Sequence, residues 1–253
     1  AKIFVTAGAK SVLGNLLDLV DVHTTASVPD PVYPVYVDDN VMAGRKILYM
    51  AASAENNFLP MPDDNVHADI VYLCSPNNPT GRRVAQPVLE AILRRAEEEK
   101  VWLVVDECFL DFLQQRDALT AKPLLQAAPN LVILKAFTKL YAMAGVRLGY
   151  ALCANTALLA KMQAAGQPWG VSSLAQAAGA AALRETAYAD AVRALIADQR
   201  PKLAAGLRAL GLQVIEGRAN YLLFRAPETL GTALQQRGVC LRSCGNYPGL
   251  SAG

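Results

Sequence analysis

The sequence has few residues of the kinds that build disulfide frameworks and metal sites. Its 253 residues include five cysteines and two histidines. Five scattered cysteines are too few for a disulfide scaffold, and Cys240 and Cys244 lack the spacing of a zinc ligand pair, so we predict no metal site. Cys74, Cys108 and Cys153 lie in or beside apolar runs, which favours buried thiols in a reducing cytoplasm.

The sequence also lacks long apolar runs and an excess of charge of either sign. No apolar run approaches the ~20 residues that a membrane-spanning helix needs, and no signal peptide is visible at the start. The 24 basic and 22 acidic residues give a net charge of +2, so nothing indicates a nucleic-acid or membrane partner. We therefore expect a cytoplasmic protein that binds a small molecule.

What the sequence does contain is an alternation of apolar strands with amphipathic helices. The predicted strands are residues 2–6, 46–52, 68–74, 101–106, 131–137 and 148–153, and the predicted helices are residues 8–20, 87–100, 155–166 and 174–211. Strands that alternate with helices predict a mostly parallel sheet, and hence a three-layer α/β fold with helices on both faces.

Other parts of the chain are predicted to be less regular. Residues 24–40 are rich in proline, which favours an irregular or edge segment. Residues 138–147 are predicted as a turn or loop, and Pro201 is expected to kink or divide the long helix.

The last part of the chain predicts a second, smaller α+β unit. It consists of short strands at residues 212–217, 219–226 and 238–244 around a helix at residues 229–238. We expect a large domain over residues 1–185 and a small domain over residues 186–253.

Polar residues follow three of the predicted strands. Asn78 lies in the turn SPNNPTG, Asp106 ends the run VWLVVD, and Lys139 follows the run LVILKAF, with Arg147 eight residues later. Ligands in open α/β sheets bind beyond the carboxyl ends of parallel strands, so we expect these side chains to form one site. Each residue also has a structural alternative: turn chemistry for the asparagine, a salt bridge or helix cap for the aspartate, and surface charges for the lysine and arginine.

Together these residue types suit a pocket for pyridoxal 5'-phosphate (PLP). A lysine can form a Schiff base with an aldehyde. A buried carboxylate needs a cationic partner, which a pyridinium nitrogen provides. The planar fork of Arg147 suits a phosphate, and the amide of Asn78 can donate to a phenolate oxygen.

Two weaker signals lie near the start of the chain. The Gly8–Lys10 turn joins a strand to a helix, a geometry that offers backbone N–H groups to an anion, although an ordinary strand-to-helix turn is the commoner interpretation. Tyr33 lies between two prolines and is suited to stacking on a flat heterocycle; a core tyrosine is the alternative.

The motifs SPNNPTG, VVDE and KAFTKLYAMAGVRLGY resemble those of the class I/II aminotransferases, which are PLP enzymes of fold type I, and the resemblance covers nearly the whole chain. It implies a homodimer with the site at the interface and an amino acid substrate. It implies that Lys139 binds PLP and moves the Cα proton, and that Asp106 pairs with the pyridine nitrogen. It further implies that Asn78 hydrogen-bonds the phenolic oxygen and that Tyr33 stacks on the ring. Ala9, Lys10 and Arg147 are implied to bind the phosphate, and Thr138 is implied to belong to the same cofactor-binding set.

Different parts of the chain resemble different members of this group. The first part is similar to LL-diaminopimelate aminotransferases, and the rest looks more like threonine-phosphate decarboxylases of cobalamin synthesis and histidinol-phosphate aminotransferases. Phe109 stands where most aminotransferases of the group have tyrosine, a departure that the decarboxylases share. Ala136 replaces a frequent serine, which puts one phosphate contact in doubt. Transamination is therefore the first hypothesis, and decarboxylation of L-threonine O-3-phosphate is the second.

The resemblance also bears on the two ends of the sequence. An N-terminal segment that closes the active site and a C-terminal arginine that holds the substrate carboxylate are both expected to lie outside it, which leaves the small domain incomplete. A non-catalytic module with the PLP fold is therefore a third hypothesis. No G-x-G-x-x-G follows the first strand, which argues against a Rossmann-type nucleotide enzyme.

Overall fold

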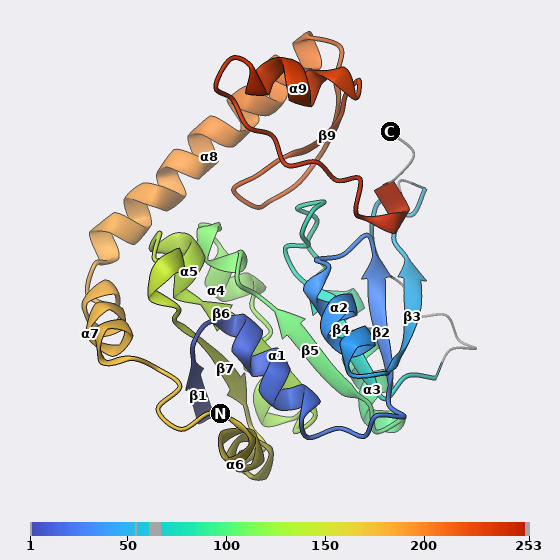
Figure 1. Cartoon of the computed structure of the whole chain (residues 1–253), viewed down its shortest axis with the longest axis vertical. Coiled ribbons are helices and arrows are strands. Elements are labelled where there is room, and N and C mark those ends of the chain that lie inside the picture. Colours follow the sequence, from blue (N-terminus) through green and yellow to red (C-terminus); the bar gives the residue numbers. More distant parts are fainter. Residues whose placement is uncertain (1, 54, 61–66, 251–253) are drawn as a thin grey trace.

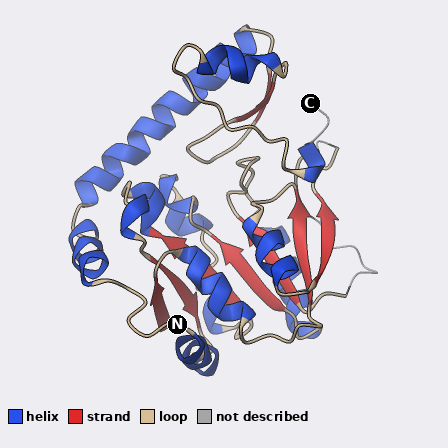
Figure 2. Cartoon of the chain, viewed as in Figure 1, coloured by secondary structure: helices blue, strands red, loops and turns tan. Residues whose placement is uncertain are grey.

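A seven-stranded sheet forms the centre of the computed structural model, which describes residues 2–53, 55–60 and 67–250. The strand order is β1-β7-β6-β5-β4-β2-β3. The strands from β6 to β3 run parallel, and β7 is antiparallel to both of its neighbours. Helices cover both faces of the sheet (Figures 1 and 2). The predicted three-layer, mostly parallel α/β fold is confirmed.

The elements of this unit follow one another in the expected alternation. The strands are β1 (Lys2–Thr6), β2 (Thr25–Asp30), β3 (Lys46–Ala51), β4 (Ile70–Cys74), β5 (Trp102–Asp106), β6 (Leu131–Ala136) and β7 (Gly149–Cys153). The helices are α1 (Ala9–Leu17), α2 (Val35–Met42), α3 (Gln86–Glu98), α4 (Arg116–Leu119), α5 (Phe137–Leu140) and α6 (Thr156–Ala165), with 3-10 turns η1 (Leu110–Phe112), η2 (Lys122–Gln126) and η3 (Ala144–Val146).

The central strands are apolar nearly throughout because both of their faces are covered. Alternate side chains of β6 enter two separate cores. Val132 and Leu134 pack on the face covered by α1 and α6, whereas Leu131 and Ile133 pack on the face covered by α3. This two-sided burial holds the carboxyl ends of β4, β5 and β6 in fixed positions, side by side.

The C-terminal part of the chain forms a smaller unit beside the sheet. It contains α8 (Thr186–Ala209), β8 (Gln213–Ile215), β9 (Leu223–Arg225), α9 (Thr229–Gln235) and the 3-10 turn η4 (Pro248–Leu250). The preceding helix α7 (Ser173–Ala182) packs against Phe137 and Leu148 of the large unit. Strands β8 and β9 pair antiparallel as a second sheet. Figure 1 shows α8 leading from the large unit to this hairpin and α9. No helix within the described residues is both long enough and apolar enough to cross a membrane.

The two units meet at a direct contact between main chains. The backbone N–H of Arg218 donates to the carbonyl oxygen of Gly81 at 2.7 Å. A Cβ atom on Gly81 would lie 3.0 Å from the Cα of Gly217, and one on Gly217 would lie 3.0 Å from the carbonyl oxygen of Thr80. Gly81 also has a φ of +68°, so a side chain is unfavourable there on two counts.

The prediction that residues 24–40 are irregular or at an edge is wrong. They contain β2, which lies between β3 and β4 inside the sheet, and most of α2. Pro29 is tolerated there because the ladder between β2 and β4 consists of the pairs at Ala26 and Ser27 only, so it ends before the residue without an N–H.

Three further local predictions differ from the structure, including the division of the long helix at Pro201. Residues 138–147 are not only turn, since α5 and η3 form there; a helix of one turn is too short to show periodicity. Helix α8 continues through Pro201, and the break in the long helix falls at residues 183–185 instead. Its 24 residues tolerate the loss of one hydrogen bond. Residues 238–244 form no strand, because they pair with no neighbouring strand among the described residues.

Candidate active site

One cavity, of about 170 Å³, lies beyond the carboxyl ends of β4, β5 and β6. All eight predicted site residues line it: Ala9, Lys10, Tyr33, Asn78, Asp106, Thr138, Lys139 and Arg147. Leu13, Tyr36, Cys74, Cys108, Phe109 and Ala136 complete the lining. The residues come from five separate segments of the chain, which the sheet brings to a single edge, as expected for an open α/β fold.

Asp106 is the last residue of β5, and two hydrogen bonds orient its carboxylate. The Tyr36 hydroxyl donates to Oδ2 at 2.5 Å, and the backbone N–H of Cys108 donates to Oδ1 at 2.8 Å. Burial, followed by the negative charge of Asp106, raises the pKa of Tyr36 well above its ordinary value of 10.0. Tyr36 therefore stays protonated and continues to donate to the carboxylate, which still lines the cavity.

Two lysines only four residues apart have different surroundings. Lys135, in β6, is buried and forms ion pairs with Glu107 at 3.3 Å and Asp111 at 2.7 Å. Lys139, in α5, forms no ion pair with a carboxylate within the described residues; its Nζ lies 5.3 Å from the centroid of the Phe109 ring. Lys139 is thus the lysine whose amine is available to a ligand in the cavity.

The start of α1 faces the cavity without a side-chain cap. Gly8 precedes the helix with a φ of +92°, and no side chain satisfies the first N–H groups of α1, which have no acceptors within the helix. Arg147 lies against this turn, because a Cβ on Gly8 would be 2.8 Å from its Nη2. We call the Gly8–Lys10 backbone together with Arg147 the phosphate cradle. The Lys10 side chain points elsewhere, with its Nζ 3.7 Å from Asp39, so its contribution comes from its backbone.

A glycine in β7 allows the phosphate cradle to lie directly against the sheet. A Cβ on Gly149 would lie 2.5 Å from the backbone N of Ala9 and 2.7 Å from the carbonyl carbon of Gly8. Only a residue without a side chain lets the turn approach β7 this closely.

Tyr33 and Asn78 also line the cavity. Tyr33 is 38% exposed and packs edge-on against Tyr36, with 5.9 Å between ring centroids. The Tyr247 hydroxyl donates to Oδ1 of Asn78 at 3.4 Å. Because this contact uses the oxygen of the amide, the NH₂ group of Asn78 is left to donate to a ligand.

The C-terminal unit holds the turn that carries Asn78. The Tyr221 hydroxyl donates to the carbonyl oxygen of Asn77 at 2.6 Å. The Tyr221 ring also packs edge-on against Phe109, with 5.0 Å between centroids. Both units therefore contribute to the shape of the cavity.

The sequence analysis missed Tyr36 and Tyr247. Tyr36 lies three residues after Tyr33, a helical spacing that could have placed both rings near the site. The contact between Tyr247 and Asn78 joins residues 169 positions apart, and no local sequence pattern predicts it.

The groups around this cavity match the groups of PLP one for one. PLP carries an aldehyde, a ring nitrogen, a phenolic oxygen and a phosphate. The cavity offers the amine of Lys139, the carboxylate of Asp106, the amide of Asn78, and the guanidinium and helix N-terminus of the phosphate cradle. The residues present therefore fit this cofactor.

Comparisons with known proteins agree with this chemistry. A family model described as aminotransferase class I and II matches residues 1–253. Threonine-phosphate decarboxylase of Salmonella typhimurium is 37% identical over 188 residues, which are 73% of this chain and 51% of that protein. Histidinol-phosphate aminotransferase of Symbiobacterium thermophilum is 34% identical over 225 residues, 87% of this chain and 61% of that protein.

The fold is shared with solved structures of the same group. The crystal structure of the histidinol-phosphate aminotransferase from Clostridium acetobutylicum superimposes with a TM-score of 0.90 and 25% identity, over 98% of this chain and 75% of that one. The chain spans about half to three-fifths of the length of the two curated relatives named above. It belongs to the family of class I and II aminotransferases, whose members use PLP.

Proposed function

We propose that this chain forms the PLP-binding part of an enzyme that transaminates an amino acid, with Lys139 as the covalent anchor of the cofactor. The observation that carries the proposal is that Asp106, at the end of β5, and Lys139, in the helix that follows the adjacent strand β6, line one cavity with Asn78 and Arg147. When bound, PLP supplies an electron sink for negative charge at the substrate Cα.

Each residue of the chain then has a separate task. The Lys139 amine would hold the cofactor through its aldehyde, and as a free amine it would take and return the proton at the substrate Cα. Asp106, held by Tyr36, keeps the ring nitrogen protonated. The phosphate cradle binds the phosphate through N–H groups and a planar guanidinium, and Tyr33 stacks on the ring face.

A second reaction, decarboxylation of L-threonine O-3-phosphate, is favoured by Phe109. Its ring lies beside the Lys139 amine and has no hydroxyl to donate to the phenolic oxygen of the cofactor. The decarboxylase of Salmonella typhimurium is also similar over 73% of the chain. Both reactions begin with the same binding of PLP and differ in which bond at the substrate Cα breaks.

The anchor is tested by titrating PLP into the protein and following the visible absorption band of the bound cofactor. Lys139→Ala should abolish the band, whereas Lys161→Ala, at an exposed lysine of α6, should leave it intact. A band that persists in Lys139→Ala would show that another residue binds the aldehyde.

The reaction is tested with the PLP-loaded protein. Formation of a keto acid from amino donors supports transamination, and release of CO₂ from threonine phosphate without a keto acid supports decarboxylation. If neither product forms, the non-catalytic module is the better description of this chain.

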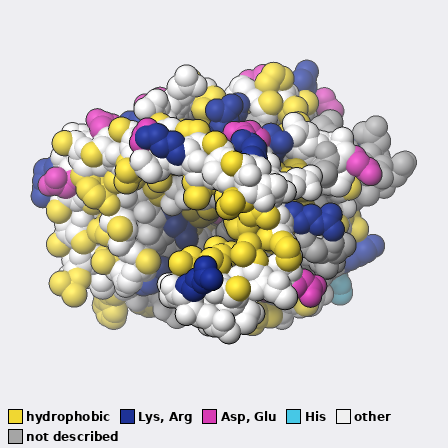
Figure 3. All heavy atoms as spheres, turned by 90° about the horizontal axis from the view of Figure 1, so that it is seen from above, with side chains coloured by type: hydrophobic (Ala, Val, Ile, Leu, Met, Phe, Trp, Pro, Cys, Tyr) yellow, Lys and Arg dark blue, Asp and Glu magenta, His cyan; other side chains and the backbone are white. Residues whose placement is uncertain are grey.

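We also propose that the protein is a cytoplasmic homodimer. Apolar side chains lie exposed on the side where α7 and α8 run, at the left of Figure 3. Leu174 is 82% exposed and Leu183 is 64% exposed, which favours coverage by a second copy. Light scattering that gives the mass of a single chain would contradict the dimer.

A further inference from the structure

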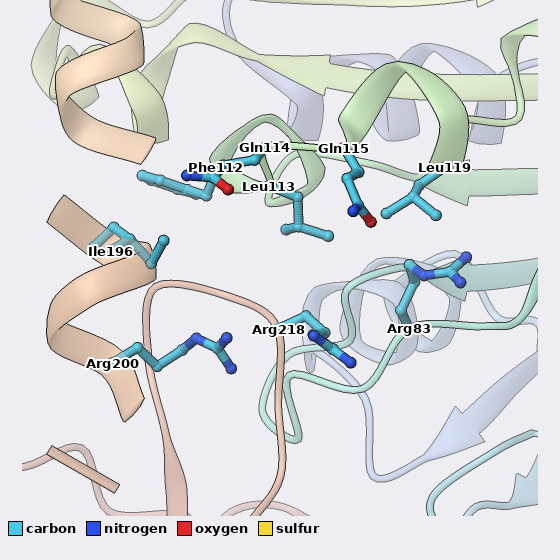
Figure 4. Close-up of a pocket in the computed structure, with 10 residues that line it drawn as sticks. Arg83, Phe112, Leu113, Gln114, Gln115, Leu119, Ile196, Arg200 and Arg218 are labelled. Carbon is cyan, nitrogen blue, oxygen red and sulfur yellow. The ribbon is translucent and has the colours of Figure 1, made fainter. Parts of the chain in front are cut away.

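A second cavity, of about 320 Å³, lies between the large unit and the C-terminal unit (Figure 4). Arg83 comes from the turn before α3, Arg200 from α8, and Arg218 from the segment between β8 and β9. Leu113, Gln114 and Gln115, between η1 and α4, line it with Phe112, Leu119, Ile196 and Ala197. We call this cavity the arginine pocket. It shares no lining residue with the cavity around Lys139.

The charge of the arginine pocket is one-sided. Its lining holds three arginines and no carboxylate. Glu216 lies at the edge, 4.0 Å from Arg200, and its closer partner is Arg208 at 2.8 Å. Arg83 donates to the carbonyl oxygen of Val84 and Arg200 to that of Gly217; neither contact removes charge. Within the described chain, Arg83 and Arg218 take part in no ion pair.

The surroundings oppose the positive charge that the pocket carries. Burial lowers the pKa of Arg83, and the positive charge of Arg218 lowers it further. Burial also lowers the pKa of Arg200, an effect that Glu216 counters and Arg218 reinforces. Arg208, Arg200 and Arg218 all lower the pKa of Glu216, so this one carboxylate is shared among three arginines. The remaining positive charges repel one another, and a bound anion would reduce that repulsion.

We propose that the arginine pocket binds a phosphate group, which bridges Arg83 of the large unit to Arg200 and Arg218 of the C-terminal unit. A planar guanidinium fork matches the oxygens of a phosphate, and Gln114 and Gln115 add neutral donors on the facing wall. In Figure 4, Leu113 and Leu119 project into the hollow from the same wall as Gln115. This apolar wall suits the organic part of a phosphate ester. Both free phosphate and a small phosphate ester supply the group that the arginines bind.

The bridge has a mechanical consequence. The same turn between β4 and α3 carries Asn78 toward the active site and Arg83 toward the arginine pocket. An anion that joins Arg83 to the C-terminal unit therefore holds the two units together, and binding to the folded state raises the unfolding temperature.

The test is isothermal titration of inorganic phosphate into the PLP-loaded protein, so that the phosphate cradle is already filled. Arg83→Gln and Arg218→Gln should each weaken binding about tenfold or more, because each removes a charge-assisted contact. Arg237→Gln is the matched control; it removes one positive charge at an exposed position outside the pocket and should leave the affinity unchanged.

Arg218 is exposed and its side chain makes no hydrogen bond within the described residues, so Arg218→Gln is expected to fold. Equal melting temperatures of Arg218→Gln and Arg237→Gln without phosphate check this. With phosphate, only Arg237→Gln should gain the thermal shift of the unchanged protein.

The proposal is overturned if phosphate does not bind the PLP-loaded protein, or if the Arg83→Gln, Arg218→Gln double variant binds it as tightly as Arg237→Gln does. A parallel titration with phenyl phosphate separates the two sources. Tighter binding than inorganic phosphate assigns the site to organic phosphates, and equal binding assigns it to the free ion; both results support the site.

Discussion

Replacing Gly149 by alanine tests whether the close approach of β7 to the phosphate cradle is needed for cofactor binding. The new methyl group would lie 2.5 Å from the Ala9 nitrogen and 2.9 Å from the Gly8 Cα. These are backbone atoms, so no side-chain rotation relieves the contact. Gly149 is also fixed in the sheet by pairing with Thr6 and Ala136. The turn before α1 must therefore move.

The structure sets the size of the expected effect. Overpacking at a tight site lowers the free energy of unfolding by about 1–3 kcal/mol. For a chain of this size, each kcal/mol lost lowers the melting temperature by about 2–4 °C. Losing one N–H contact to the charged phosphate costs about 1.5–3 kcal/mol, so the Kd for PLP should rise about 10- to 150-fold. PLP affinity should thus fall even at temperatures where the variant stays folded.

The assays are a thermal melt without PLP and a titration of PLP by its visible absorption. Gly14→Ala is the control, since Gly14 lies in α1, the helix that begins at the phosphate cradle, and a Cβ there would meet no atom within 4 Å. It should leave the Kd unchanged and stabilise the protein by about 0.5–1 kcal/mol. If Gly149→Ala binds PLP as tightly as the unchanged protein does, the proposed cradle is wrong.

Three further predictions concern buried polar contacts. Tyr36→Phe removes one of the two hydrogen bonds that orient Asp106, so the Kd for PLP should rise about tenfold; an unchanged Kd in an absorption titration contradicts this role. Lys135→Met leaves the buried Glu107 without its cation, and the free energy of unfolding in urea should fall by about 3–5 kcal/mol. Burial lowers the pKa of Lys135, but Asp111 and Glu107 raise it above its ordinary value of 10.5 overall. The stability that Lys135 contributes is therefore fully present below pH 10.5 and is lost as the pH rises through the higher, folded value; Lys135→Met should flatten this alkaline decline in urea melts.

Much of the site was predictable because its residues are attached to strands that the sequence identifies. Asp106 ends one strongly apolar run and Lys139 follows another. Runs this apolar are expected to be strands buried on both faces, and parallel strands bring their carboxyl ends to one edge of the sheet. Position along the chain then fixed position in space without any long-range information. The same reasoning brought Asn78 into the cavity, since its turn follows a strand of the same kind.

The errors arose where a distant part of the chain decides the local structure. β2 contains a proline yet lies inside the sheet, because its pairing with β4 ends at Ser27, before Pro29, whereas its pairing with β3 continues to Asp30. Residues 238–244 have a strand-like composition but pair with no strand within the described residues. Tyr247 reaches Asn78 from the other end of the sequence. The composition of a segment indicates which secondary structure it can form. Whether it forms that structure depends on the segments that lie beside it in the fold.

The contact between Gly81 and Gly217 limits which hybrid proteins can be built from this family. The joint relies on a hydrogen bond from the Arg218 backbone to the Gly81 backbone, and a β-carbon on either glycine would lie only 3.0 Å from backbone atoms across the joint. A chimaera that takes its C-terminal unit from another member can dock it in the same way only if that donor also supplies a glycine at the crossing. Fragment exchange that aims at new specificities should therefore begin with family members that have glycine at the positions of both Gly81 and Gly217.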